Sequence, residues 1–163
     1  MAILTHIDEQ GRARMVDVGS KESTARLAVA RGYVYMHDTT LQAIIEQQVA
    51  KGDVLQVARL AGIMGAKQTP GLIPLCHPLA LTSVEVDLTP EQNPARVRIE
   101  ARVRTIGRTG VEMEALTAVT VASLTVYDMC KSMDRQMRLA DIELLYKSGG
   151  KSGEYAHPAY ETA

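Results

Sequence analysis

Alternation of apolar and polar residues is clearest in the middle of the chain. Residues 83–88 and 97–104 place Val, Leu, Ile or Ala at every second position, with charged or hydroxyl residues between them. This pattern predicts two strands with one buried face each, joined by the turn TPEQNP at 89–94. Shorter β-rich runs at 12–18 and 33–36 predict two further strands, separated by a mixed Ala/Arg stretch.

Other segments repeat apolar residues at helical spacing. Asp38 and Thr39 offer N-cap oxygens to a first helix that is expected to end near residue 51. Asp53 is the expected cap of a second helix, in which Gly62 and Gly65 indicate close packing against a neighbour. The residues expected on the apolar face of this second helix are Val54, Val57, Ala58, Ala61 and Met64.

The order of elements indicates the fold class. The longest helix is predicted for 114–137 and a last strand for 142–146, and strands and helices mix without strict βαβα alternation. The prediction is therefore an α+β fold, with a mostly antiparallel sheet and helices packed on one face. One domain is expected over 1–163. Its polar, glycine-rich tail is expected not to pack and to be mobile from about residue 148 without ligand.

Prolines interrupt the chain after the second predicted helix. Three of them within TPGLIPLCHP are expected to break regular structure, which places Leu75, Cys76 and His77 in a constrained loop. His77 is a candidate acid or base near neutral pH. Cys76 would be a nucleophile only if a neighbouring base lowered its pKa. A structural histidine and an inert thiol are the alternatives.

Composition narrows the function mainly by exclusion. Phe and Trp are absent and Tyr occurs six times, so few rings remain to stack nucleic-acid bases. The net charge is -1 without a long basic run, which counts against a DNA-binding domain. Two cysteines and four histidines form no metal-ligand spacing. The N-terminal segment resembles no secretory leader and no apolar stretch is long enough to cross a membrane, so a cytoplasmic location is expected.

Charged residues on the longest predicted helix are candidates for acid–base chemistry. Asp128 and Lys131 are three residues apart, so their side chains meet on one face. Beside apolar neighbours, a half-buried carboxylate would have a shifted pKa, whereas a surface ion pair would contribute little. Glu112, Met113 and Glu114 begin the same helix, where carboxylates favour the positive end of the helix dipole even without a catalytic role.

The length of this helix creates a distance problem. If the helix is continuous, Glu114 and Asp128 are roughly 20 Å apart. Either the acidic residues lie on backbone that folds back, or one site combines elements of neighbouring subunits. Lys51, in the break between the first two helices, is a candidate phosphate ligand or simply an exposed connector lysine.

The segment KSGGKSG at 147–153 has the composition of a phosphate-binding loop, because glycines expose N–H groups and lysines supply positive charge. A Walker motif ending at Gly150-Lys151-Ser152 would require glycine at Leu145 and a following helix, and too few residues remain for one. A P-loop NTPase is therefore disfavoured. A flexible basic loop over a polyphosphate and a solvated terminus both remain open.

Several motifs occur together in one order along nearly the whole chain. They are THID at 5–8, MVDV at 15–18, KGDV at 51–54, LIPLCHPL at 72–79, SVEV at 83–86, TGVEMEALTA at 109–118, YDMCK at 127–131 and KSGGKSG at 147–153. In these motifs the chain resembles the MoaC family, the cyclic pyranopterin monophosphate synthases of molybdenum-cofactor biosynthesis. The resemblance implies a ferredoxin-like subunit, a homohexamer built as a trimer of dimers with active sites at subunit interfaces, and no metal or organic cofactor.

The resemblance also implies a reaction and a set of site residues. The substrate would be (8S)-3′,8-cyclo-7,8-dihydroguanosine 5′-triphosphate, converted to cyclic pyranopterin monophosphate and diphosphate. Asp128 matches the catalytic residue of the family. The matching substrate-binding residues are Leu75, Cys76, His77, Met113 and Glu114. Further positions that match residues lining the site are Lys51, Glu112, Lys131 and Lys147.

A mechanism can be written as a hypothesis from these residue types. Asp128 acts as general acid/base with Lys131 tuning it or donating a proton, while Glu112 or Glu114 holds the N–H donors of the guanine-derived edge. The candidate phosphate ligands are Lys51, Lys147 and Lys151. Two other classes stay open: a non-catalytic nucleotide- or pterin-binding module and a scaffold subunit. Acid/base residues clustered beside lysines disfavour the scaffold.

Overall fold

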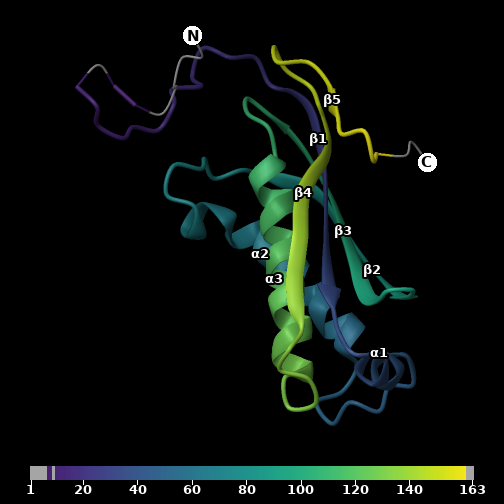
Figure 1. Ribbon diagram of the computed structural model, residues 1–163. Helices are drawn as coiled ribbons and strands as arrows, with labels where there is room; N and C mark the ends of the chain where they lie inside the picture. Colours follow the sequence, from purple (N-terminus) through teal and green to yellow (C-terminus); the bar gives the residue numbers. More distant parts are fainter. Residues whose placement is uncertain (1–6, 9, 161–163) are drawn as a thin grey trace.

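A five-stranded antiparallel sheet forms the centre of the computed structural model, which describes residues 7–8 and 10–160. The long helices α2 and α3 lie along one face of this sheet (Figure 1). In chain order the elements are β1 (Thr24–Tyr35), α1 (Asp38–Ile45), α2 (Val54–Leu72), β2 (Leu81–Gln92), β3 (Ala95–Gly107), α3 (Glu112–Cys130), β4 (Arg138–Ser148) and β5 (Tyr155–Ala156).

The topology of the sheet identifies the fold. Its strand order is β2-β3-β1-β4-β5, and each neighbouring pair is antiparallel. β1 and β2 therefore run parallel with β3 between them, connected by α1 and α2, and α3 connects β3 to β4. This βαββαβ order is the ferredoxin-like arrangement. The predicted α+β class, with helices on one face of an antiparallel sheet, is confirmed.

The core lies between the sheet and α3. Along β3, alternate residues from Ala95 to Thr105 are buried while those between them are half-buried, as the alternating sequence predicts. Small residues on α3 bring the helix close to this surface. The central buried side chains are Ala28, Ala30, Val34, Val97, Ile99, Ala101, Val103, Ala115, Ala118, Val119, Ala122 and Val126. Aliphatic residues thus fill the core of a chain without Phe or Trp.

Two glycines let α2 approach α3. A Cβ at Gly62 would lie 3.0 Å from the carbonyl oxygen of Ala118, and one at Gly65 would lie 2.9 Å from the Cβ of Val121. Both positions therefore require glycine for the observed helix spacing, as the sequence predicted. The apolar face predicted for α2 is partly wrong, because Val57 is 44% exposed and Met64 46% exposed.

The prediction of a strand at 12–18 was wrong. These residues lie outside the sheet, and within them only Ala13 makes an isolated bridge, to Ile7. The Ala/Arg stretch that was expected to separate two strands instead forms most of β1. Ala28 and Ala30 pack on the helix side, whereas Arg31 lies on the open face in an ion pair with Glu143 at 2.8 Å. A central strand with a charged outer face therefore lacks the usual β-rich composition.

The predicted helix ends also need correction. His37 rather than Asp38 is the N-cap of α1, without a side-chain cap, and α1 ends at Ile45 rather than near residue 51. α2 continues through Pro70 to Leu72, because proline removes only one hydrogen bond and the last turn still closes. The Asp53 cap of α2 is confirmed, since its carboxylate accepts the N–H of Gln56. α3 ends at Cys130, not at 137.

The remaining differences lie in the hairpin and the tail. The β2–β3 turn occupies only Asn93 and Pro94, so the strands are longer than predicted. The tail was expected not to pack, yet Tyr155 and Ala156 pair with β4, and Tyr160 stacks on Tyr146 with ring centroids 4.8 Å apart. Its mobility without ligand stays a prediction. Among the described residues, none of the helices is both long and apolar enough to cross a membrane.

Candidate active site

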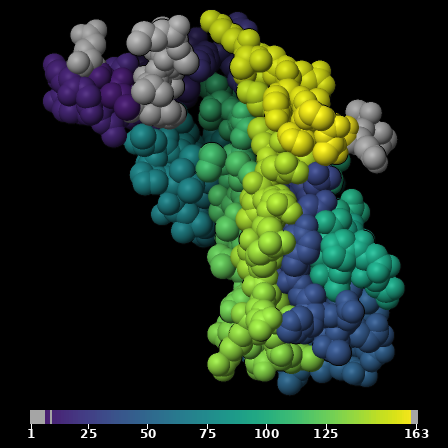
Figure 2. Space-filling view, in the orientation of Figure 1, coloured from purple at the N-terminus to yellow at the C-terminus, as the bar shows by residue number. Residues whose placement is uncertain are grey.

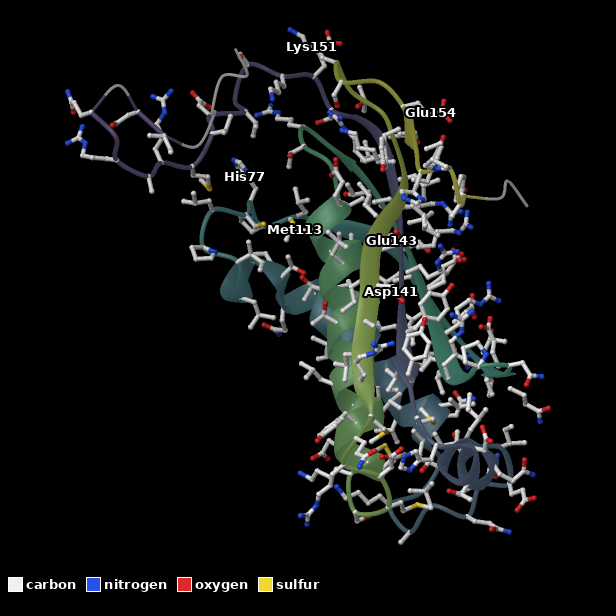
Figure 3. All side chains as sticks on the ribbon, viewed as in Figure 1. His77, Met113, Asp141, Glu143, Lys151 and Glu154 are labelled. Atoms are coloured by element: carbon white, nitrogen blue, oxygen red, sulfur yellow. The ribbon has the colours of Figure 1, made fainter. Side chains whose placement is uncertain are left out.

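The N-terminal end of α3 borders a cavity of about 300 Å³. The loop between α2 and β2 contributes Leu75, Cys76 and His77 to its lining, and the first turn of α3 contributes residues 112–114. Figure 3 shows His77 and Met113 close to this end of the helix. The two segments predicted to bind substrate therefore meet in the fold, although 35 positions separate Cys76 from Val111 in the sequence.

The N-terminal segment orients His77. Its Nε2 atom lies 2.8 Å from the carbonyl oxygen of Val16, and Val16 itself lines the cavity. If Nε2 carries the proton, it donates to this carbonyl and leaves Nδ1 as an acceptor. The imidazole can therefore accept or deliver a proton at the cavity while the segment around Val16 holds the ring.

Cys76 is not arranged as a nucleophile. Burial raises the pKa of its thiol, and the carboxylate of Glu114 raises it further. The thiolate is the reactive form, so this environment makes Cys76 less reactive near neutral pH. Cys76 thus lines the cavity as a weakly polar surface, in agreement with the inert alternative.

Two carboxylates of α3 face different environments. Glu114 is 3% exposed, and burial raises its pKa, against an opposing effect of its own backbone N–H and with a smaller addition from Glu112. Glu112 is half-buried and its carboxylate lies 3.2 Å from the Lys147 ammonium. One helical turn therefore offers a carboxyl that holds its proton more readily and a carboxylate paired with a cation.

A larger cavity of about 840 Å³ adjoins the first. The two share lining residues, among them Lys21, Thr109 and Glu112. The larger cavity is strongly basic, and its cationic lining residues are Lys21, Arg26, Arg108, Lys147 and Lys151. These five cations face two carboxylates, Glu22 and Glu112. This excess of positive charge suits a multiply charged anion such as a polyphosphate.

The glycines of KSGG seat one of these cations. Gly149 and Gly150 have φ values of +99° and +74°, and a Cβ on Gly150 would overlap the guanidinium of Arg26. The same guanidinium is held from the other side, because its Nε donates to the carbonyl oxygen of Gly107 at 3.2 Å. Glycine at 149 and 150 thus lets Arg26 stack against the turn at the wall of the basic cavity.

The opposite end of α3 carries a second cluster. The Lys51 ammonium donates to the backbone carbonyl of Asp128 at 2.8 Å and to its carboxylate at 3.1 Å. The Lys131 ammonium lies 2.7 Å from the other carboxylate oxygen. Hydrogen bonds from Lys131 and then Lys51 lower the pKa of Asp128, and Asp128 in turn raises the pKa of Lys131.

This cluster is exposed, so that of the two alternatives left open by the sequence the surface ion pair is found, and not the half-buried carboxylate. The Asp128 side chain is 59% exposed, and Met133 is also largely exposed because α3 ends at Cys130. Desolvation therefore has little effect here, and the two ammonium groups determine the protonation of Asp128. A carboxylate between two lysines can exchange a proton with them or with a bound molecule.

The two ends of α3 cannot meet within one chain. α3 is continuous from Glu112 to Cys130, so its rise of about 1.5 Å per residue separates Glu114 from Asp128 by roughly 20 Å. The alternative in which the acidic residues lie on backbone that folds back is therefore wrong. Each chain presents two separate groups of candidate residues, one at each end of the helix.

Comparison with known proteins places this geometry in a family. The family model described as the MoaC family matches residues 15–150, a span that includes both ends of α3. The chain belongs to the MoaC family. Relatives named cyclic pyranopterin monophosphate synthase occur in Pelotomaculum thermopropionicum, 60% identical over 99% of this chain and 95% of the relative, and in Rhodospirillum rubrum, 65% identical over 93% and 92%. A third, from Roseiflexus sp., is 60% identical over 96% and 99%.

The MoaC site residues predicted from the motifs fall into two groups in the structure. The first lies around the two cavities and comprises Leu75, Cys76, His77, Glu112, Met113, Glu114 and Lys147. The second is the cluster of Lys51, Asp128 and Lys131. Their catalytic and binding roles stay predictions. Among the described residues of this MoaC chain, no three His, Cys, Asp or Glu side chains are grouped to hold a metal ion.

Sequence reasoning missed three cations of the basic cavity, Lys21, Arg26 and Arg108. None belongs to a motif with a distinctive spacing. Lys21 follows the misassigned strand, and Arg26 lies in the Ala/Arg stretch that was not recognised as β1. A correct assignment of β1 beside the β3–α3 loop was the signal that could have found Arg26.

Proposed function

We propose that this chain is a cyclic pyranopterin monophosphate synthase, a lyase that converts (8S)-3′,8-cyclo-7,8-dihydroguanosine 5′-triphosphate to cyclic pyranopterin monophosphate and diphosphate in molybdenum-cofactor biosynthesis. The names and coverage of the MoaC relatives support this reaction. The observation that carries it on the chain itself is the joining of a small carboxyl-lined cavity to a large basic one. A purine-derived ring with a triphosphate needs both.

We place the substrate with its guanine-derived edge at the small cavity and its phosphates in the basic cavity. Glu112 and Glu114 offer acceptors to the N–H groups of the ring edge. Arg26, Lys147 and Lys151 neutralise phosphate oxygens and stabilise the diphosphate as it leaves. This differs from the sequence hypothesis, because Lys51 lies at the far end of α3 and is not grouped with Lys147 in one chain.

The reaction needs proton transfers as the purine-derived ring opens and the pyranopterin forms. It then needs a substrate oxygen to bond to the α-phosphorus while the bond to the β-phosphate oxygen breaks. Asp128 acts as general acid/base, and its position between Lys51 and Lys131 supports this role. The lysines keep the carboxylate ionised, and each can return a proton to a leaving group. His77 is a second proton carrier at the small cavity.

A second copy of the chain must complete the site. An exposed stripe along α3, formed by Met113, Leu124 and Asp128, supports this arrangement. Leu124 follows Met113 by 11 residues and Asp128 follows it by 15, close to three and four whole turns, so the three side chains lie on similar sides of the helix. Two copies packed through this stripe about a two-fold axis perpendicular to α3 run antiparallel. The Asp128 end of one α3 then lies beside the Met113 end of the other, and two equivalent sites form.

Exposed apolar residues on the helix layer support the same contact. Val57 is 44% exposed, Leu60 62%, Met64 46% and Leu124 54%, which is costly for a surface that stays in water. The hexamer, a trimer of such dimers, is the assembly that we propose, and its mass in solution by light scattering tests it. The cytoplasmic location likewise remains a prediction, and so does closure of the 147–153 loop over phosphates.

The direct test is to incubate the purified protein with the cyclised dihydro-GTP substrate. Cyclic pyranopterin monophosphate is followed by chromatography and diphosphate release is measured in parallel. We expect both products in equal amounts. A folded oligomer that binds the substrate and forms neither product would instead favour the non-catalytic nucleotide- or pterin-binding module.

A further inference from the structure

Asp134 is a buried carboxylate that the reaction scheme above does not use. Its side chain is 0% exposed, and Glu114 is the other carboxylate of the described residues that is buried. An ionised carboxylate in this position is costly unless hydrogen bonds compensate for the lost water. Its partners therefore indicate what the residue does.

The donors to Asp134 come from two separate elements. One carboxylate oxygen accepts the backbone N–H of His37 at 2.9 Å, and the other accepts the backbone N–H of Gln136 at 2.9 Å. The Thr40 hydroxyl also hydrogen-bonds to the carboxylate. His37 and Thr40 belong to the junction between β1 and α1, whereas Gln136 lies in the loop that leaves α3. The carboxylate thus joins two segments that are 97 positions apart.

These two segments carry the exposed cluster at the end of α3. The chain runs from His37 through α1 to Lys51, and the loop that holds Asp134 begins at Lys131, one turn after Asp128. The three cluster residues are each about half exposed and contact one another only at the surface. Asp134 supplies a buried connection beneath them, since its own N–H also donates to Cys130 in the last turn of α3, at 3.1 Å.

We propose that Asp134 is a positioning residue that fixes the β1–α1 junction against the end of α3 and so holds Lys51 and Lys131 on either side of the Asp128 carboxylate. This inference rests on the proposed function, in which Asp128 exchanges protons. Asp134 touches neither substrate nor the reacting atoms, and it acts through the geometry of the other three residues.

The charge of Asp134 suits this role. Burial raises its pKa, but the N–H donors of His37 and Gln136 outweigh burial, so that its pKa lies below the ordinary value. The carboxylate is therefore ionised near neutral pH. An asparagine would turn a donor toward N–H groups that need an acceptor. The other titratable groups that face Asp134 are the His37 ring, with Nδ1 at 3.6 Å, and Cys130, whose pKa is raised to about 11 mainly by burial.

Loosening this connection has a consequence for pH dependence. The groups that face Asp128 are Lys131 and Lys51, and both lower its pKa; Tyr127 lies beside Lys131. When the two segments separate, the ammonium groups move away and the pKa of Asp128 rises toward its ordinary value. The acid limb of the kcat profile then moves to higher pH. A loss of stability alone does not move that limb.

A pair of isosteric substitutions tests the proposal. Thr40→Val removes one donor to Asp134, and Thr69→Val removes a comparable buried hydroxyl, which donates to Gly65 at 3.2 Å away from the cluster. We expect Thr40→Val to lower kcat about 10-fold with KM within about twofold, because positioning affects the chemical step. We expect Thr69→Val to leave both unchanged. Asp134→Asn should lower kcat about 100-fold if it folds.

A spectroscopic measurement separates this proposal from the proposed function. The pKa of the Asp128 carboxyl carbon is followed by NMR in ¹³C-labelled wild type and in both threonine variants, without substrate. We expect a higher pKa in Thr40→Val only. An unchanged Asp128 pKa and an unchanged acid limb in Thr40→Val would overturn the positioning role even in an active enzyme. A shifted pKa in a protein that forms no product would leave the positioning role intact and overturn the proposed function.

Discussion

At the residue scale, the proposed acid–base chemistry is tested most directly at Asp128. Its carboxylate is fixed by two lysines and lies on the surface of the chain, so Asp128→Asn removes the charge without disturbing the core. We expect turnover to fall about 100-fold or more while the oligomer stays folded. Product formation under substrate saturation measures this. Asp87→Asn, at a carboxylate that is 80% exposed on β2, is the matched control and should keep wild-type turnover. Retained turnover in Asp128→Asn would remove its assigned role.

Glu114 gives a second prediction at this scale, which concerns the pH dependence of folding stability rather than the turnover rate. Burial raises its pKa, so the folded protein keeps this proton to higher pH than the unfolded chain. Stability is therefore lost as pH rises from the ordinary carboxyl pKa of about 4.3 through the raised value. Glu114→Gln cannot ionise, and its stability should decline less over this window.

The measurement is the melting temperature at pH 4 and pH 7. Wild type and Glu114→Gln should differ little at pH 4, and the variant should melt higher at pH 7, by about 2–4 °C for each 1 kcal/mol of relieved penalty. The exposed Glu46→Gln is the control and should not alter the pH dependence. A variant that melts lower than wild type at pH 7 would show that the ionised form of Glu114 is stabilised by contacts absent from the single chain.

At the element scale, the packing of α2 against α3 depends on glycine at position 65, whereas position 71 of the same helix has no such requirement. A Cβ on Gly65 would lie 2.9 Å from the Cβ of Val121, on a helix that cannot yield easily. We expect Gly65→Ala to destabilise the protein by about 1–3 kcal/mol, since overpacking forces the helices apart. Gly71→Ala is the control in the same helix, because nothing lies within 4 Å of its Cβ position. It should stabilise by about 0.4–1 kcal/mol. Urea unfolding of both variants measures the difference, and equal effects would contradict the packing argument.

The strands and helices also show which parts of the fold could be predicted from local sequence pattern. Alternation along 97–104 predicted β3 because one face of that strand packs on α3 and the other is charged. The same logic failed for β1, where alanine and glycine fill the buried face and Arg31 and Tyr33 lie on the other, so local composition did not resemble a strand. The predicted helix ends were wrong for a related reason. α1 stops at Ile45 although apolar Val49 continues its pattern and is buried outside the helix.

For the candidate site, motif resemblance supplied residue identities and the fold supplied their grouping. The sequence placed His77 and Met113 in separate motifs, and only the ferredoxin-like arrangement brings the α2–β2 loop to the start of α3. Arg26 belongs to none of the motifs, and its place beside Gly150 depends on the pairing of β1 with β4. Long-range pairing of this kind is set by the whole sheet rather than by local pattern.

At the scale of the whole molecule, the two groups of candidate residues lie at opposite ends of one elongated subunit. The upper end of Figure 1 holds the start of α3, the N-terminal segment and β5, whereas the lower end holds α1 and the loop that leaves α3. The space-filling view in Figure 2 shows the elongated body between these ends, with the described residues from 10 onward, drawn in purple, projecting to one side. The basic cavity and the Asp128 cluster therefore lie at opposite ends of one subunit, and the composite site that we propose combines them from two subunits in antiparallel contact.

Mixing of inactive subunits tests this composite site. Asp128→Asn damages one end of α3, and Lys147→Met removes a phosphate ligand at the other end, so a dimer that contains one of each has one site with both halves intact. Random co-assembly of the two variants makes half of the dimers mixed, and we expect about a quarter of wild-type activity to return. Asp128→Asn co-assembled with Lys131→Met is the control, because both lesions lie at the same end and every site stays damaged. Activity that fails to return in the first mixture, while mass measurements show mixed oligomers, would mean that neighbouring subunits do not combine the two ends of α3 in one site, and that one of the two residue groups has no part in the reaction.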